Sequence, residues 1–235
     1  MSVHGRSGRP SGTTQARTFG RKDRTTVTDA QCRTAWQLQS LLISYPDEQL
    51  APRLPLISGV SAALPESLGD PLARFLAYAS ATPPVTLAAE YVATFDHHKR
   101  FSPYLTYFTH GDTRNRGMAL LGIKHTYRRF GLILDDAELP DHLAVILEFA
   151  AAHPEPGRQL LTRYRAGLEL LHRGLCDSGS PWTDVVDSVT ATLPPLRSRD
   201  HDRIAHLAAA GPPDEAVGLD PFAPPEVISQ GDLRR

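Results

Sequence analysis

The amino-acid sequence predicts an all-α protein, a single-domain helical bundle formed by residues 29–210. Apolar residues recur at spacings of three and four through most of this range, as they do on the buried face of a helix. No run alternates apolar and polar residues between turn dipeptides, so the sequence indicates no strand. The 235 residues are 41% hydrophobic, which is enough for the core of one domain.

The two ends of the chain differ from this body in composition. Residues 1–28 are rich in Gly, Ser, Thr and Arg and predict a disordered basic arm, because so few apolar side chains cannot offset the entropy of ordering. Residues 211–235 contain five prolines and predict a disordered or loosely docked tail. No apolar segment follows the basic arm, and no stretch is long enough for a membrane span. We therefore expect neither a secretory signal nor a span, and a cytoplasmic location.

The first predicted helix begins at Thr28 or Asp29, either of which can cap it, and ends before Pro46. The prolines of residues 47–60 predict one or two short turns. Asp70, followed by proline, predicts the cap of a second helix.

Residues 86–95 predict another helix, with aromatic side chains one turn apart. Ser102 before a proline predicts the cap of a short helix over residues 103–108. Thr109 or Asp112 is expected to cap the next helix, which ends at Gly131. Its expected buried face is Leu120, Ile123, Tyr127 and Phe130.

The last part of the body contains an apolar segment and three amphipathic segments. From Pro140 the chain is apolar nearly all round, which is typical of a helix at the centre of a bundle. Residues 154–175 predict one long helix. A helix around Trp182 is expected to stop at the Pro194–Pro195 pair, and residues 200–210 predict one more.

Enzyme motifs are absent from the sequence. Cys32 and Cys176 are far apart and form no CxxC pair, so they predict no disulfide framework. The chain contains no phosphate-binding glycine loop and no nucleophile elbow.

The segment Tyr91–Gly117 is the densest in aromatic, histidine and basic residues. Aromatic side chains among Lys99 and Arg100 are also typical of single-stranded nucleic-acid binding, which leaves that partner class as an alternative. Most of these aromatics lie at helical spacing, which favours a place in the core. Residues 31–235 have a net charge of −5, which opposes a nucleic-acid partner.

Metal-dependent hydrolysis is a second alternative. His110 and Asp112 are two residues apart, and Asp141 precedes His142, so a fold that joins these pairs would form a His/Asp metal site. No HExxH motif accompanies them. Solvent-facing or hydrogen-bonded histidines are the simpler interpretation.

Peptide capture is the interpretation that we favour. A groove with an aromatic floor and a carboxylate rim suits an amphipathic segment with a basic end, because the apolar face is buried and charge sets the register. The candidate rim acids are Asp112, Glu138, Asp141 and Glu148.

Two segments resemble a known family. SPYLTYFTHGDTRNRGMALL, residues 102–121, is preceded by YVATFD and followed by ELPDHLAVILEFAA. Together they resemble the NarJ-type assembly chaperones of respiratory nitrate reductase, also called the nitrate reductase delta subunit, within the wider TorD-like group. The resemblance covers about residues 34–175.

This resemblance implies an all-helical chaperone without turnover. Such a protein binds the N-terminal segment of the apo catalytic (alpha) subunit and supports insertion of the molybdopterin guanine dinucleotide cofactor, which it does not hold stably. Cofactor-delivery proteins would be further partners, and a homodimer is left open. Residues 138–142, with the sequence ELPDH, resemble the family's peptide-binding loop. From the groove hypothesis and this resemblance together, we expect the client-binding residues to be Tyr91, Phe95, Tyr104, Tyr107, His110, Asp112, Arg114, Glu138, Pro140, Asp141, His142 and Glu148.

Overall fold

The computed structural model describes residues 27–96, 99–135 and 138–213, and confirms the all-α class. Its elements are α1 (Asp29–Ile43), α2 (Leu50–Ser61), α3 (Glu66–Ala81), α4 (Pro84–Phe95), the short 3-10 helix η1 (Lys99–Phe101), α5 (Tyr107–His110), α6 (Arg114–Arg129), α7 (Leu143–Ala152), α8 (Pro154–Arg163), α9 (Arg165–Ser178), α10 (Trp182–Ala191) and α11 (Ser198–Ala210). Within the described ranges, the sole β pairing is an isolated antiparallel bridge between Tyr104 and His142.

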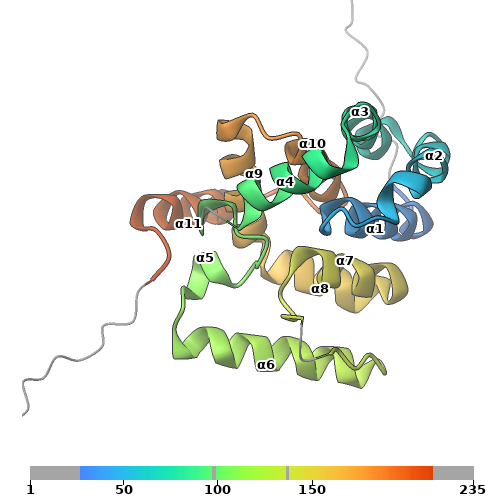
Figure 1. The fold of residues 1–235 in the computed structure, drawn as a ribbon. Coiled ribbons are helices and arrows are strands. Elements are labelled where there is room, and N and C mark those ends of the chain that lie inside the picture. The colour runs from blue at the N-terminus through green and yellow to red at the C-terminus, as the bar shows by residue number, and fades with distance from the viewer. Residues whose placement is uncertain (1–26, 97–98, 136–137, 214–235) are drawn as a thin grey trace, which may run out of the picture.

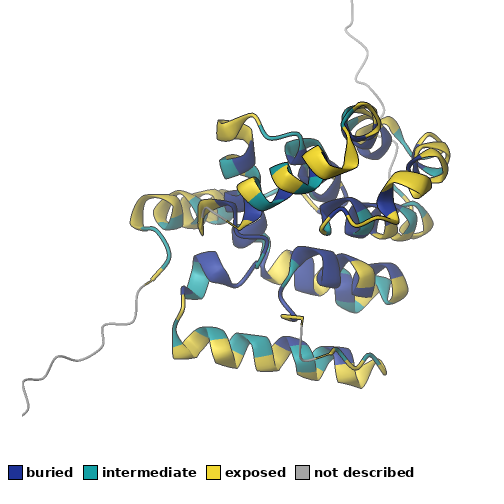
Figure 2. Ribbon diagram, in the orientation of Figure 1, coloured by how far each residue is buried: buried dark blue, intermediate teal, exposed yellow. Residues whose placement is uncertain are grey.

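Helix α7 lies at the centre of the molecule, as its apolar sequence predicts. It packs against α1 and α8. Helix α10 packs against α1, α3 and α9 (Figure 1). Figure 2 shows α7 buried along most of its surface, whereas α6 and α11 expose long outer faces. Glu148 and the terminal Ala152 are the exposed residues of α7.

The ends of α1 are those expected from local chemistry. The Thr28 hydroxyl accepts the Gln31 N–H at 3.3 Å, and the Gln31 side chain accepts the Thr28 N–H at 2.8 Å, which together form a capping box. The helix stops at Ile43, shortly before Pro46.

Two predictions around prolines are wrong. Residues 47–60 do not form short turns but include the helix α2. Pro52 lies in its first turn, where no backbone bond is lost, and the helix continues through Pro55 because Leu54 and Ile57 are buried. Asp70 does not cap α3, which begins at Glu66 and contains Pro71. The Pro65 carbonyl accepts the N–H groups of the first turn, and burial of Leu68 and Leu72 favours the earlier start.

The predicted helix over residues 103–108 is also misplaced. Residues 103–105 instead pair with residues 141–143: the Leu105 N–H donates to the Asp141 carbonyl at 3.0 Å, and the Leu143 N–H donates to the Pro103 carbonyl at 2.9 Å. The short helix α5 therefore begins only at Tyr107. This pairing joins segments almost forty residues apart, so helical spacing within either segment could not reveal it.

Helix α6 begins at Arg114, so neither Thr109 nor Asp112 caps it. Its end is as expected, because Gly131 has φ +81°, a conformation that favours glycine. Ile123 and Tyr127 are buried, but Phe130 is 41% exposed and Leu120 half-buried, so the predicted face is only partly covered.

The predicted long helix over residues 154–175 is divided at Tyr164 into α8 and α9. Gly167, in the first turn of α9, packs directly on the backbone of residue 105: a Cβ there would lie 2.2 Å from the Leu105 carbonyl oxygen. The turn between α8 and α9 thus brings α9 against residues 103–105.

Most of the expected arm and tail lies outside the described residues. The structure includes Val27 and Thr28 of the arm, and Gly211–Pro213 of the tail. In the described part of the chain, no helix combines the length and the apolar character needed to cross a bilayer.

Candidate functional site

A buried carboxylate lies where α5, α6 and the 138–142 turn meet. Asp141 is completely buried, and its Oδ2 accepts the Thr106 hydroxyl at 2.5 Å and the Thr106 N–H at 3.3 Å. Because its backbone carbonyl also accepts the Leu105 N–H, this residue joins the 138–142 turn to the chain before α5.

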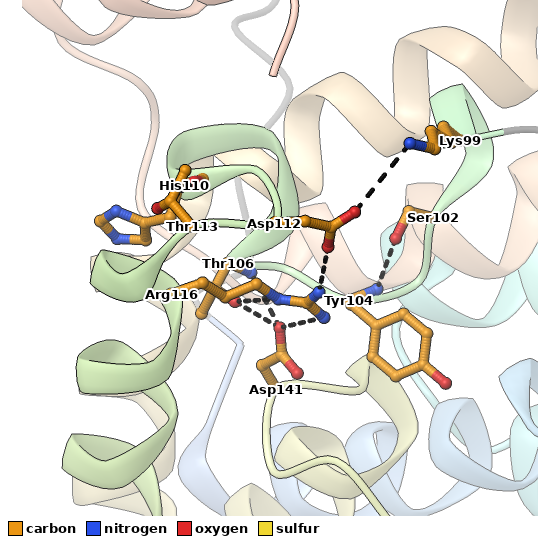
Figure 3. Close-up of polar contacts among 9 residues, drawn as sticks. All are labelled: Lys99, Ser102, Tyr104, Thr106, His110, Asp112, Thr113, Arg116 and Asp141. Atoms are coloured by element: carbon orange, nitrogen blue, oxygen red, sulfur yellow. Dashed lines mark hydrogen bonds and ion pairs between the residues drawn. The ribbon is translucent and has the colours of Figure 1, made fainter. Parts of the chain in front are cut away.

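Arg116 connects this carboxylate to the surface. Its Nη2 lies 3.7 Å from Asp141 Oδ2, and its Nη1 donates to Asp112 Oδ1 at 2.9 Å (Figure 3). The guanidinium also lies 5.7 Å from the ring centres of Tyr104 and Tyr107, within cation–π range. At 15% exposure, the Arg116 side chain is the cation that balances the buried acid.

Two of the four expected rim acids are therefore placed differently from our hypothesis. Asp141 cannot be a rim charge, because none of it is exposed. Asp112 is exposed, but its carboxylate is shared between Arg116 and Lys99, whose Nζ lies 3.9 Å away. Both acids stabilise the turn at the start of α6.

The other two acids line a cleft of about 440 Å³. Its walls come from the end of α1, from α4, from the 138–142 turn and from α7. We call it the acidic cleft; its lining residues are Ser40, Ser44, Tyr45, Tyr91, Tyr104, Glu138, Leu139, His142, Ala144, Val145 and Glu148.

Aromatic side chains form one side of the acidic cleft. Tyr45, 55% exposed, meets the ring of Tyr91 edge-on at 5.6 Å, and Tyr104 meets the His142 ring edge-on at 5.2 Å. The Tyr91 hydroxyl donates to the Ile43 carbonyl at 3.2 Å, which holds its ring against α1.

The charge of the cleft is negative. Glu138 and Glu148 are exposed, and no Lys or Arg occurs among the described residues that line it. Burial lowers the pKa of His142 to about 4, so this ring is neutral at pH 7. The neutral Nδ1 accepts the Ala144 N–H at 3.2 Å and caps α7. Burial is also the largest cause of the raised pKa of Tyr104.

Five of the predicted site residues thus meet at one cleft: Tyr91, Tyr104, Glu138, His142 and Glu148. The other seven lie elsewhere. Phe95 is in the core, with its ring centre 5.6 Å from that of Trp182. Pro140 is buried, and its carbonyl accepts the Tyr127 hydroxyl at 2.8 Å. His110 and Arg114 flank the turn that holds Asp112, and burial is the largest cause of the lowered pKa of His110.

Tyr107 lines a different and larger cavity, of about 870 Å³, between α5, α9 and α11. Lys99, Arg100 and Arg173 also line this cavity together with Asp177, so its net charge is opposite to that of the acidic cleft. Its size alone does not make it the better match for a basic peptide.

Three residues of this region were not among the candidates. Thr106 and Arg116 hold Asp141, and Tyr45 lines the acidic cleft. Arg116 could have been found from its position four residues after Asp112, the spacing of a helical ion pair. Tyr45 is at helical spacing from Leu41 and Leu42, and nothing in this spacing indicates that it lies beyond the helix end.

The four residues of the hydrolase alternative do not form a metal site in this geometry. The carboxylates of Asp112 and Asp141 both face Arg116, and His142 Nδ1 caps α7. Over the described ranges, no group of three or more His, Cys, Asp or Glu side chains is placed to hold a metal ion. The geometry gives this alternative no support.

Comparison with known proteins agrees with the resemblance of the two motifs. The family model described as nitrate reductase delta subunit matches residues 61–187. The nitrate reductase-like protein NarX of Mycobacterium tuberculosis is 38% identical over 67% of this chain, but the aligned region is only 24% of NarX. A Bacillus subtilis protein named "Probable nitrate reductase molybdenum cofactor assembly chaperone NarJ" is 33% identical over 68% of this chain and 89% of its own length.

A solved structure shares the fold. It is a protein of Archaeoglobus fulgidus described as a redox enzyme maturation protein, 25% identical, with a TM-score of 0.51 over 68% of this chain and 91% of that one. Because the family model matches more than half of this sequence and the Bacillus relative aligns over most of its length, the chain belongs to the nitrate reductase delta subunit family, which includes the NarJ-type chaperones.

Proposed function

We propose that this chain is an assembly chaperone for a respiratory nitrate reductase. It binds the N-terminal segment of the apo catalytic subunit and keeps that subunit competent for insertion of the molybdenum cofactor before membrane docking. Membership of the delta subunit family and the names of the NarJ relatives support this proposal. In this scheme the cofactor is inserted into the catalytic subunit and is not held by the chaperone. The chaperone itself catalyses no reaction.

The acidic cleft is the observation that carries the proposal. It combines two exposed carboxylates, three tyrosine rings and the 40% exposed side chain of Leu139. An amphipathic helix can place apolar anchors among these rings, while its basic residues meet Glu138 and Glu148. Its volume suits a few anchor side chains and not a whole helix, so affinity would depend on those anchors.

The Asp141 network has a supporting role in this proposal. Asp141 fixes the 138–142 turn, and that turn supplies Glu138, Leu139 and His142 to the cleft. Asp112, His110 and Arg114 lie on the turn that presents Arg116 to Asp141, so they act on the cleft through position and not through contact.

Titration calorimetry of the full chain with a synthetic peptide tests this function. The peptide is the first ~15–20 residues of a nitrate reductase catalytic subunit, a length suited to one amphipathic helix. We expect saturable binding that the Glu138→Gln/Glu148→Gln double variant weakens at least about tenfold, because charge-assisted contacts are lost. Asp70→Asn, which removes an exposed acid from α3, is the matched control and should bind as the wild type does.

Absence of binding heat with the wild-type chain would exclude the peptide-capture proposal. Equal weakening by Asp70→Asn would show that only net charge matters and would remove the acidic cleft from it. Pull-down from cells tests the wider scheme, in which the catalytic subunit and cofactor-delivery proteins are partners in the cytoplasm. Mass measurement of the purified chain tests the homodimer.

A further inference from the structure

Five arginines surround a second cleft, of about 270 Å³, whose lining residues all follow those of the acidic cleft in the sequence. It lies where the end of α8 and the start of α9 meet the segment that leads into α11. We call it the arginine cleft; its basic lining residues are Arg163, Arg165, Arg197, Arg199 and Arg203. None of the twelve predicted site residues lines it.

The charges of this cleft are only partly neutralised. Asp200 is the one carboxylate among the described lining residues, and its Oδ2 already accepts the Arg197 N–H at 3.0 Å. Arg165 is paired with Glu169 at 2.5 Å. Five positive charges, less those of Asp200 and Glu169, leave a net charge of +3. Arg199 and Arg203 are exposed on α11 and supply two of the charges.

Two helices begin at the same place. Arg165 starts the 14-residue α9, and Arg197 precedes the 13-residue α11. The first N–H groups of a helix have no partner within it, and the helix dipole places partial positive charge at that end. At Tyr164 the negative end of α8 offsets the positive end of α9, so the groups that favour an anion are the arginine side chains and the start of α11.

We propose that the arginine cleft binds the phosphate groups of a small polyphosphate-type anion, with inorganic pyrophosphate as the minimal ligand. Guanidinium groups pair with phosphate through two parallel N–H···O bonds, and helix N-termini bind the same group. The volume admits a pyrophosphate but not a whole nucleotide, so a nucleoside would remain outside. An extended acidic peptide needs a longer groove with apolar pockets, and Leu196 and Ile204 are the only large apolar residues of this lining.

The arginine cleft is electrically linked to the turn after α5. Beside the effect of burial, Arg203 and Arg163 also lower the pKa of His110. A bound anion would neutralise these two arginines, so it would raise the pKa of His110 towards its ordinary value. This change gives the proposal a spectroscopic readout that is independent of affinity.

Titration calorimetry of the full chain with inorganic pyrophosphate, at low and at moderate salt, is the primary test. We expect a single saturable site whose affinity falls with salt. The Arg199→Gln/Arg203→Gln double variant should lower that affinity at least about tenfold, because two charge-assisted pairs are removed. Arg53→Gln, which removes an exposed arginine from α2, is the control and should leave it unchanged.

Two further measurements define the ligand. If adenosine diphosphate binds as tightly as pyrophosphate, the ligand is the phosphate end of a nucleotide. If adenosine diphosphate binds more weakly than pyrophosphate, the ligand is the free anion. Nuclear magnetic resonance of the His110 ring should show its pKa rising with pyrophosphate in the wild-type chain but not in the double variant. Thermal melting of the double variant should match that of the wild type, because both substituted side chains are exposed.

Three results would overturn the proposal: no saturable pyrophosphate binding, the same loss of affinity in Arg53→Gln as in the double variant, or tighter binding of an acidic peptide than of pyrophosphate. A His110 pKa that does not move on saturation would place the bound anion outside the arginine cleft. The client peptide binds a different cleft, so failure of either proposal leaves the other intact.

Discussion

Asp141 and Arg116 face each other across the junction of the 138–142 turn and α6, with Arg116 Nη2 3.7 Å from the fully buried Asp141 Oδ2. The Thr106 hydroxyl completes the pair at 2.5 Å. This contact holds the turn that supplies one wall of the acidic cleft. Loss of the ion pair should therefore change the shape of the cleft.

Asp141→Ala should lower the free energy of unfolding by about 3 kcal/mol, because it leaves a largely buried guanidinium without its partner. Chemical denaturation followed by circular dichroism measures this change. Arg116→Gln combined with Asp141→Ala should cost less than the sum of the single changes, since both act on one pair. Asp112→Asn is the exposed control, for which we expect about 0.5 kcal/mol or less. An Asp141→Ala chain as stable as the wild type would show that the pair does not hold the turn.

Protonation of His142 should destabilise the fold in acid. The folded ring has a pKa of about 4, and an unfolded histidine has its ordinary value near 6.5. The unfolded chain therefore binds a proton that the folded chain does not, and stability falls as pH drops from about 6.5 to about 4. The full loss from this group is about 3 kcal/mol.

Comparison of the wild type with His142→Asn isolates this effect from the carboxylates. Asparagine keeps a capping acceptor but does not titrate, so the difference in unfolding free energy between the two chains should vary with pH in that window. A difference that stays constant from pH 7 to pH 4 would contradict the low pKa of His142.

Gly167→Ala should destabilise the protein by at least about 2 kcal/mol, because the new methyl group would collide with the backbone of residue 105. Gly122→Ala on α6 is the matched control: nothing lies within 4 Å of its added Cβ, so we expect a gain of about 0.5–1 kcal/mol. Thermal melting of both variants measures these opposite effects. Equal shifts in the two would show that helix propensity, and not the close approach at Gly167, decides the result.

Client-peptide binding should weaken as ionic strength rises. Exposed carboxylates such as Glu138 and Glu148 steer a basic peptide through charges that salt screens over about 8–10 Å. Calorimetric titrations between about 0.05 and 0.5 M salt should show the decline in the wild type and a much flatter curve in the Glu138→Gln/Glu148→Gln variant. A steep curve in the double variant would assign the salt dependence to charges outside the acidic cleft.

Local chemistry along the chain predicted most of the helices. The Thr28 cap, the stop before Pro46 and the positive φ of Gly131 each depend on one residue and its immediate neighbours. Predictions failed where packing overrode local preference. Burial of Leu68 and Leu72 extended α3 through Pro71, and pairing with residues 141–143 prevented a helix at 103–105.

The candidate site was predictable in its segments but not in the roles of its residues. Glu138 and Asp141 both carry a carboxylate and are three residues apart. Glu138 is exposed at a cleft, whereas Asp141 is fully buried. Only the position of Arg116 and Thr106 separates these outcomes, and both lie more than twenty residues away. The arginine cleft was missed for a similar reason, since its five arginines are divided between two distant segments.

The sequence by itself determined the helical class, several helix ends and the family, because these depend on periodicity, on single capping or breaking residues and on two contiguous motifs. The tertiary structure alone decided which acids are exposed, which tyrosines meet at the acidic cleft and where the arginines gather. These properties depend on burial and on contacts between residues far apart in the chain, and such contacts are set by how the helices pack and not by any local pattern.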